Sequence, residues 1–172
     1  MSNHKNVNDI YNDAMYEFIN NNLEKSIEIL SEAAELDPGR KLTFVSRGSA
    51  YLQLNQLEKA VEIFKRGLIL ARETDNFQLI AIFLVNIGEQ QRIWGETEAA
   101  RKSFEEALEY ARKLGNQDLL AVCLNNIGEV MRTEGQYRNA MQYFKETLKL
   151  FEDAQSKPRI FSSYMNIGYT HM

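Results

Sequence analysis

The sequence predicts an all-α solenoid of antiparallel helix pairs, and the main observation is a repeat with a period of 40 residues. Glycines recur at this spacing, and so does a second marker, an alanine followed by a phenylalanine four residues later. Two markers in one register indicate a true repeat. The glycines are Gly48, Gly88, Gly128 and Gly168, and the pairs are Ala60/Phe64, Ala100/Phe104 and Ala140/Phe144.

The chain is predicted to be one repeat array over residues 1–172. In the first unit Ser26 and Leu30 hold the alanine and phenylalanine positions, 34 residues before the next pair, and Ala14 holds the glycine position. About four and a half units follow from this register. They lie near residues 7–40, 41–76, 77–116 and 117–156, with a lone first helix at 158–172.

Each unit is predicted to hold two helices, because apolar residues recur at helical spacing on both sides of a short turn. The turns carry Asn55-Gln56, Gly95-Glu96 and Gly135-Gln136, residue types that suit a tight connection between helices. The predicted helices are 7–20, 23–36, 41–54, 57–73, 77–94, 97–114, 117–134, 137–153 and 158–172.

The marker glycines require a packing reason, since glycine inside a helix costs about 1 kcal/mol relative to alanine. We expect close approach of the paired helix at these positions, where a Cβ would clash. The marker alanines are then small for the same reason on the opposing helix. The phenylalanine four residues later is expected to fill the space beside the contact.

The segment from Ala100 to Ala107, with the pattern Ala-x-x-x-Phe-x-x-Ala, resembles the tetratricopeptide repeat (TPR). The resemblance covers nearly the whole chain from about residue 7 and implies a right-handed superhelix. The long period, with the segments 70–76 and 110–116, resembles a subgroup found in Pins-type adaptors, kinesin light chains and bacterial peptide-sensing regulators. This resemblance implies a scaffold or adaptor for protein–protein interaction rather than an enzyme.

Composition limits the alternatives. The 172 residues carry a net charge of −4 with both signs interspersed, so we expect no nucleic-acid partner. The polar N-terminus has no signal-peptide pattern, and the longest apolar run, residues 79–85, is too short to span a bilayer. We therefore expect a cytoplasmic protein with no membrane partner.

Residues suited to catalysis are few. The two histidines, His4 and His171, lie near opposite ends of the sequence, and no metalloprotease, phosphate-binding or nucleophile-elbow motif occurs. Cys123 is expected to be a small buried thiol, and one cysteine supports neither an internal disulfide nor a cysteine-based zinc site. We expect no enzyme activity, no cofactor and no metal site.

The candidate binding surface follows from helix geometry. Two residues along a helix rotate the side chain by about 200°, so Asn86 should face away from the helix that Gly88 contacts. In this family the first helices of successive units line a concave channel, and subgroup members use asparagines there on extended ligands. An asparagine amide both donates and accepts hydrogen bonds. The predicted partner-binding residues are Asn86, Glu89, Arg92, Asn125, Asn126, Glu129, Arg132 and Asn166.

Further side chains are assigned to the same channel. Ser46 and Asn12 are the matching positions of earlier units, and the apolar wall is predicted to contain Val85, Ile93, Val122 and Val130. An alternative remains open: the asparagines could bridge neighbouring repeats, and Glu89 with Arg92 could form an ordinary pair within one helix, worth about 0.2–0.5 kcal/mol.

A clamp for a C-terminal carboxylate, known from co-chaperones of this fold, is not expected. The corresponding positions hold Tyr11, Met15, Ile82 and Asn86, none of which is a cation. A heat-shock chaperone tail is therefore not the expected ligand.

The last predicted helix is partly apolar. It could be a cap whose apolar side faces inward, could pair with a second chain, or could belong to a longer array. For pairing with a second chain, the residues expected to mediate homo-oligomerisation are Met165, Ile167, Tyr169 and Met172.

Overall fold

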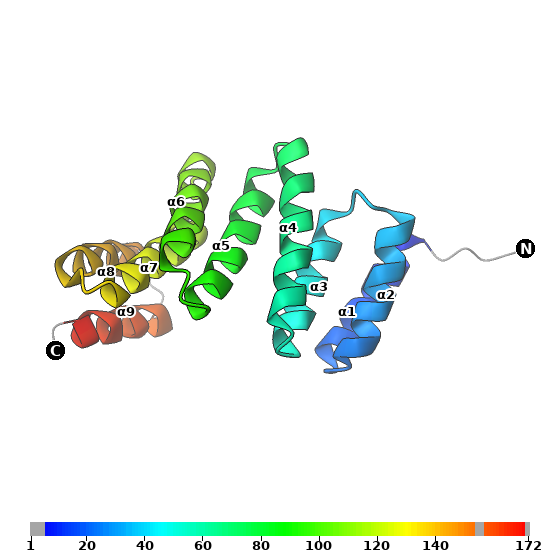
Figure 1. Ribbon diagram of the computed structural model, residues 1–172, viewed down its shortest axis with the longest axis horizontal. Coiled ribbons are helices and arrows are strands. Elements are labelled where there is room, and N and C mark those ends of the chain that lie inside the picture. Colours follow the sequence, from blue (N-terminus) through cyan, green and yellow to red (C-terminus); the bar gives the residue numbers. More distant parts are fainter. Residues whose placement is uncertain (1–5, 154–156, 171–172) are drawn as a thin grey trace, which may run out of the picture. The chain divides into compact units, whose positions relative to one another are not determined.

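The computed structural model describes residues 6–153 and 157–170, and these residues form nine helices without a strand (Figure 1). Every predicted helix is present, so the all-α class is confirmed. The ends agree within one residue, except that the predicted end of the last helix, residue 172, lies outside the described residues. The helices are α1 (Val7–Ile19), α2 (Leu23–Leu36), α3 (Lys41–Gln53), α4 (Leu57–Glu73), α5 (Phe77–Ile93), α6 (Thr97–Leu114), α7 (Gln117–Thr133), α8 (Tyr137–Asp153) and α9 (Lys157–Thr170).

Contacts divide the chain into two compact units, residues 1–79 and residues 80–172. In the first unit α1 packs on α2, and α3 packs on α4. Ser26 and Leu30 of α2 are completely buried, and the Ser26 hydroxyl donates a 2.8 Å hydrogen bond to the backbone oxygen of Ala14. Two of the residues predicted to hold the marker positions of the first repeat, Ser26 and Ala14, therefore contact each other.

The second unit contains α5 from residue 80 on, paired with α6, and then the pair α7/α8. These are followed by α9, which packs on α8. The marker residues Ala100 and Phe104 of α6, with Ala140 and Phe144 of α8, have no solvent exposure. Full burial of a phenylalanine contributes about 1.5–3 kcal/mol. The repeat markers are thus the centre of the core in this unit.

The marker glycines make room for a phenylalanine ring. A Cβ added to Gly48 would lie 2.1 Å from Cε1 of Phe64, and the corresponding distance from Gly88 to Phe104 is 2.8 Å. The prediction of a steric reason is correct, but the atoms that would clash belong to the phenylalanine side chain and not to the backbone of the paired helix. Gly168 of α9 has no such neighbour within 4 Å.

The turns within the helix pairs have a common backbone conformation. Gly95 and Gly135 have φ angles of 77° and 74°, and Asn55 has 55°. Glycine and asparagine tolerate this left-handed region better than other residues, because a bulkier side chain clashes with the backbone there. The predicted tight turns are therefore confirmed, and they let the second helix of each pair return along the first.

None of the helices in the described part of the chain has the length and apolar character needed to cross a membrane.

Candidate partner-binding groove

Polar side chains from α5, α7 and α9 surround a hollow of about 450 Å³ in the second unit. These three helices are the first helices of successive repeats, which is why residues 40 positions apart lie on the same surface. We call this hollow the polar groove. Its lining is Val85, Asn86, Glu89, Arg92, Asn125, Asn126, Glu129, Ser162 and Asn166.

Asn86 and Asn126 both line the polar groove and are half-buried, but their amides differ. The Asn86 side-chain nitrogen donates a 2.8 Å hydrogen bond to the backbone oxygen of Ile82, one turn earlier in α5. The Asn126 amide makes no hydrogen bond to any residue that the structure describes. Asn126 therefore offers both a donor and an acceptor to a ligand, whereas Asn86 retains its acceptor oxygen.

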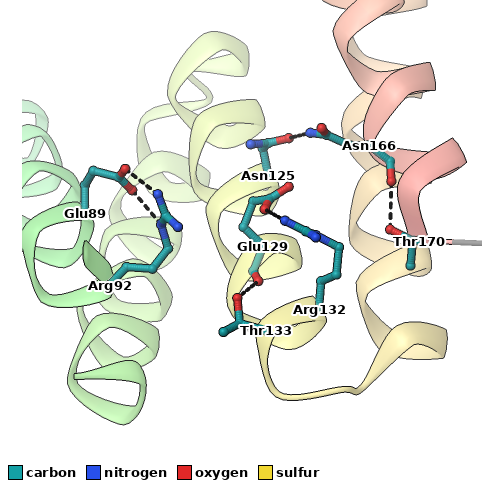
Figure 2. A network of polar contacts seen from close by, with 8 residues as sticks. All are labelled: Glu89, Arg92, Asn125, Glu129, Arg132, Thr133, Asn166 and Thr170. Atoms are coloured by element: carbon teal, nitrogen blue, oxygen red, sulfur yellow. Dashed lines mark hydrogen bonds and ion pairs between the residues drawn. The ribbon is translucent and has the colours of Figure 1, made fainter. Parts of the chain in front are cut away.

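The charged residues of the groove are paired within their own helices (Figure 2). Arg92 holds Glu89 through two hydrogen bonds, from Nε at 3.0 Å and from a terminal nitrogen at 2.6 Å. The hydrogen bond to Glu89 raises the pKa of the Arg92 guanidinium above its ordinary value. Arg132 contacts Glu129 at 2.6 Å, although Arg132 itself does not line the groove.

Asn125 and Asn166 contact each other across α7 and α9. The side-chain nitrogen of Asn166 donates a 2.8 Å hydrogen bond to the side-chain oxygen of Asn125 (Figure 2). At these two positions the bridge between repeats, predicted as the alternative, is present. Ser162 lies in the same lining and was missed, because serine is too common on helix surfaces to signal a site by itself.

Of the four residues predicted for the apolar wall, two line a hollow and two do not. Val85 lines the polar groove, and Val122 lines a neighbouring hollow described below. Ile93 is 53% exposed and belongs to neither lining. Val130 is completely buried, so its assignment to the wall is wrong. It lies three residues after the buried Ile127 and therefore on the core face of α7.

The positions of the first unit that match Asn86 and Asn126 are Asn12 and Ser46, and they differ in exposure. Ser46 is buried, and its hydroxyl oxygen lies 2.9 Å from the hydroxyl oxygen of Tyr11, with which it forms a hydrogen bond. Arg40 stacks over the Tyr11 ring at 4.5 Å from its centre. The prediction that Ser46 points into a channel is therefore wrong, whereas Asn12 is exposed.

The residues predicted for self-association are on α9. Met165 is 39% exposed, Tyr169 is 58% exposed and Ile167 is half-buried. Met172 lies outside the described residues. Two further exposed aromatic residues, Phe161 and Tyr164, lie on the same helix and were missed.

Groups with catalytic potential are sparse in the described residues. Cys123 is completely buried, and burial raises the pKa of its thiol to about 12. A thiol in this setting is inert, as the sequence predicts, because the thiolate is the reactive form. Among the described residues no group of His, Cys, Asp and Glu is arranged to hold a metal ion. His4 and His171 lie outside that part of the chain.

Comparison with protein families gives two matches. Models described as "Tetratricopeptide repeat" match residues 43–74 and residues 79–153, which together form more than half of the 172 residues. Neither describes a catalytic family. No curated protein sequence matched the chain.

Several solved structures are similar in fold. The apo form of RapI has a TM-score of 0.86 and 19% identity, over 95% of this chain and 62% of that chain. A signal-transduction ATPase with a TPR sensor from Pyrococcus horikoshii has a TM-score of 0.83 and 22% identity, over 96% of this chain and 26% of that chain. A Rap protein complexed with competence and sporulation factor has a TM-score of 0.77 and 19% identity, over 96% of this chain and 48% of that chain. The chain therefore spans less than two thirds of each of these proteins.

Proposed function

Because the chain belongs to the tetratricopeptide repeat family, we propose that it is an interaction scaffold that binds an extended peptide or a helix of a partner protein in the polar groove. The observation that carries the proposal is the lining itself, in which amide side chains from three successive first helices surround one hollow. A peptide backbone presents a donor and an acceptor at each residue, and asparagine amides complement both.

The available amide of Asn126 gives the proposal a specific contact. It is half-buried, so it lies partly shielded from water, where a hydrogen bond to a ligand contributes about 0.5–1.5 kcal/mol. Asn86, one repeat earlier, can add a second contact through its oxygen. Contacts from two repeats suit a ligand that runs across successive first helices, because Asn86 lies on α5 and Asn126 on α7.

The relatives support a protein or peptide partner. One similar structure is a Rap protein in complex with competence and sporulation factor. Since this chain spans 48% of that protein, the activity of the whole Rap protein is not transferred to it. We also propose a cytoplasmic location, which agrees with a single cysteine held as a buried free thiol.

The test is an affinity capture from source lysate, in which the wild type is compared with the Asn86→Ala/Asn126→Ala double variant. Asn139→Ala is the matched control, because Asn139 is an exposed helical asparagine that does not line the groove. Circular dichroism and thermal melting check that all three proteins fold alike.

A protein that the wild type and the control retain, and the double variant loses, supports binding in the groove. Retention of the same protein by the double variant would reject the groove as the binding site.

A second candidate function is homo-oligomerisation through α9, and the surroundings of Gly168 favour it. The equivalent glycines of earlier repeats are covered by a phenylalanine ring, whereas Gly168 is open and Phe161, Tyr164 and Tyr169 are exposed beside it on the same helix. Light scattering over a concentration series, with the wild type and Tyr164→Glu/Tyr169→Glu, tests this candidate. A monomeric mass for the wild type at the highest concentration would reject it.

A further inference from the structure

A second hollow adjoins the polar groove and has a different character. It has a volume of about 270 Å³ and shares Asn125, Asn126 and Ser162 with the polar groove. Its remaining walls include Val122 of α7 and Phe151 of α8, with Arg159 of α9. We call it the Val122 hollow. The two hollows are neighbours, because these three residues line both of them.

The Val122 hollow suits one apolar side chain. Val122 is 42% exposed although it lies in a concave site, and Phe151 is half-buried. An apolar cavity of about 150 Å³ accepts a benzene-sized group, so this hollow has room for a leucine, methionine or phenylalanine side chain. Covering these apolar atoms contributes about 25 cal/mol per Å² of surface removed from water.

The charges around both hollows are already paired within the chain. Arg159 binds Asp118 and lies 5.5 Å from the centre of the Phe151 ring. In the polar groove Glu89 is paired with Arg92, and Glu129 with Arg132. An unpaired charge on a ligand would meet no opposite charge that is not already engaged. The charge pattern therefore complements an uncharged segment, because desolvating a charge without a partner is costly.

Asn126 connects the two hollows. Its amide is without a hydrogen-bonding partner in the described residues, and it lines both sites. An asparagine amide can bond the N–H and the C=O of one ligand residue together. In an extended segment successive side chains point to opposite sides, so fixing one residue by its backbone also decides which side chain enters the hollow.

We propose that the ligand is an uncharged, extended segment of a partner protein. Its backbone pairs with Asn126, and one of its apolar side chains enters the Val122 hollow. This inference rests on the proposed function and adds the ligand chemistry to it. Asn126 fixes the position of the ligand backbone, and Val122 determines which ligand side chain is preferred in the hollow.

The test uses a displayed library of random peptides of about ten residues, which extend over roughly 33 Å. The library is selected on the immobilised wild type, and affinities of the enriched peptides are measured for the wild type and three variants. Val122→Glu blocks the hollow, and Asn126→Ala removes the amide. Tyr137→Glu is the matched control, since it places the same charge on an exposed aromatic position outside both hollows.

The expected wild-type consensus contains one apolar position with uncharged neighbours. Val122→Glu should weaken these peptides by about tenfold or more, as expected for excluding one aliphatic side chain. Tyr137→Glu should bind the peptides as the wild type does.

Replacing the apolar consensus residue of the peptide with serine should weaken binding to the wild type. The same replacement should cause little further loss with Val122→Glu, because both changes remove the same contact. Affinity should change less than about twofold between about 50 and 300 mM salt, because no new ion pair forms.

The outcomes separate the two proposals. A consensus without an apolar position, unchanged affinity for Val122→Glu, or a steep fall with salt would overturn this inference and leave the groove as the binding site. A wild type that enriches no peptide, or an Asn126→Ala variant that binds every enriched peptide as tightly, would overturn the proposed function and this inference with it.

Discussion

A Cβ atom on Gly128 would lie 2.6 Å from Cε1 of the Phe144 ring, a distance that real Cβ contacts do not reach. Phe144 is completely buried, so its ring has little room to move. Gly168, one repeat later on α9, has no neighbouring atom within 4 Å of the same position. The same residue type at the same place in the repeat therefore has two different structural roles.

Gly128→Ala and Gly168→Ala should change stability in opposite directions. Overpacking a core costs about 1–3 kcal/mol, which exceeds the helix-propensity gain, so Gly128→Ala should lower the free energy of unfolding. Gly168→Ala should raise it by up to about 1 kcal/mol, because the substitution only restricts the unfolded chain. Urea denaturation followed by circular dichroism measures both. Equal shifts for the two variants would show that Phe144 moves aside without cost.

Phe104 and Gly88 should be energetically coupled, because the ring of one occupies the space beside the other. Phe104→Ala should lower the free energy of unfolding by about 3–5 kcal/mol. Gly88→Ala should destabilise the wild type, yet stabilise the Phe104→Ala variant, in which the clash is absent. A double-mutant cycle by urea denaturation measures the difference. Additive effects would contradict the contact.

Glu17 should make stability depend on acid pH. This nearly buried carboxylate accepts hydrogen bonds from Lys25 at 2.6 Å and Asn22 at 2.7 Å, and the bond from Lys25 is the main cause of its lowered pKa. Because the pKa of Glu17 is lower in the folded protein than its ordinary value of 4.5, the ionised carboxylate stabilises the fold at pH values above 4.5. This stabilisation is lost as the pH falls through the folded-state pKa.

Melting temperatures measured over a range of pH should therefore be higher for the wild type than for the Glu17→Gln variant at neutral pH. The difference should shrink below pH 4.5 and disappear in stronger acid. A difference in melting temperature that is independent of pH would indicate a packing effect rather than the charge of Glu17.

Cys123 should be unreactive in the folded protein. Its side chain has no exposure, and a pKa of about 12 leaves on the order of one thiolate in ten thousand at pH 8. A disulfide reagent should therefore label the native chain only as fast as the second unit opens. The chain unfolded in urea should label fully and serves as the positive control. Rapid labelling without denaturant would contradict the burial of this residue.

Helix positions could be predicted from the sequence because they depend on local patterns. The ends of α2, α4, α6 and α8 agree with prediction to the residue. The turns at Gly95 and Gly135 agree as well, because the left-handed backbone conformation is a property of a few adjacent residues. The contact of each marker glycine with its phenylalanine was also accessible, since the spacing recurs in three repeats.

The sequence by itself determined the repeat, its register and the helix surface on which the 40-residue spacing places asparagines. The tertiary structure decided how each side chain on that surface is used. Only packing between helices shows that Asn166 bonds Asn125 and that the hydroxyl groups of Ser46 and Tyr11 bond each other. These contacts depend on partners 35 and 41 residues away in the sequence, and a periodic pattern does not encode which side chains meet across such a separation.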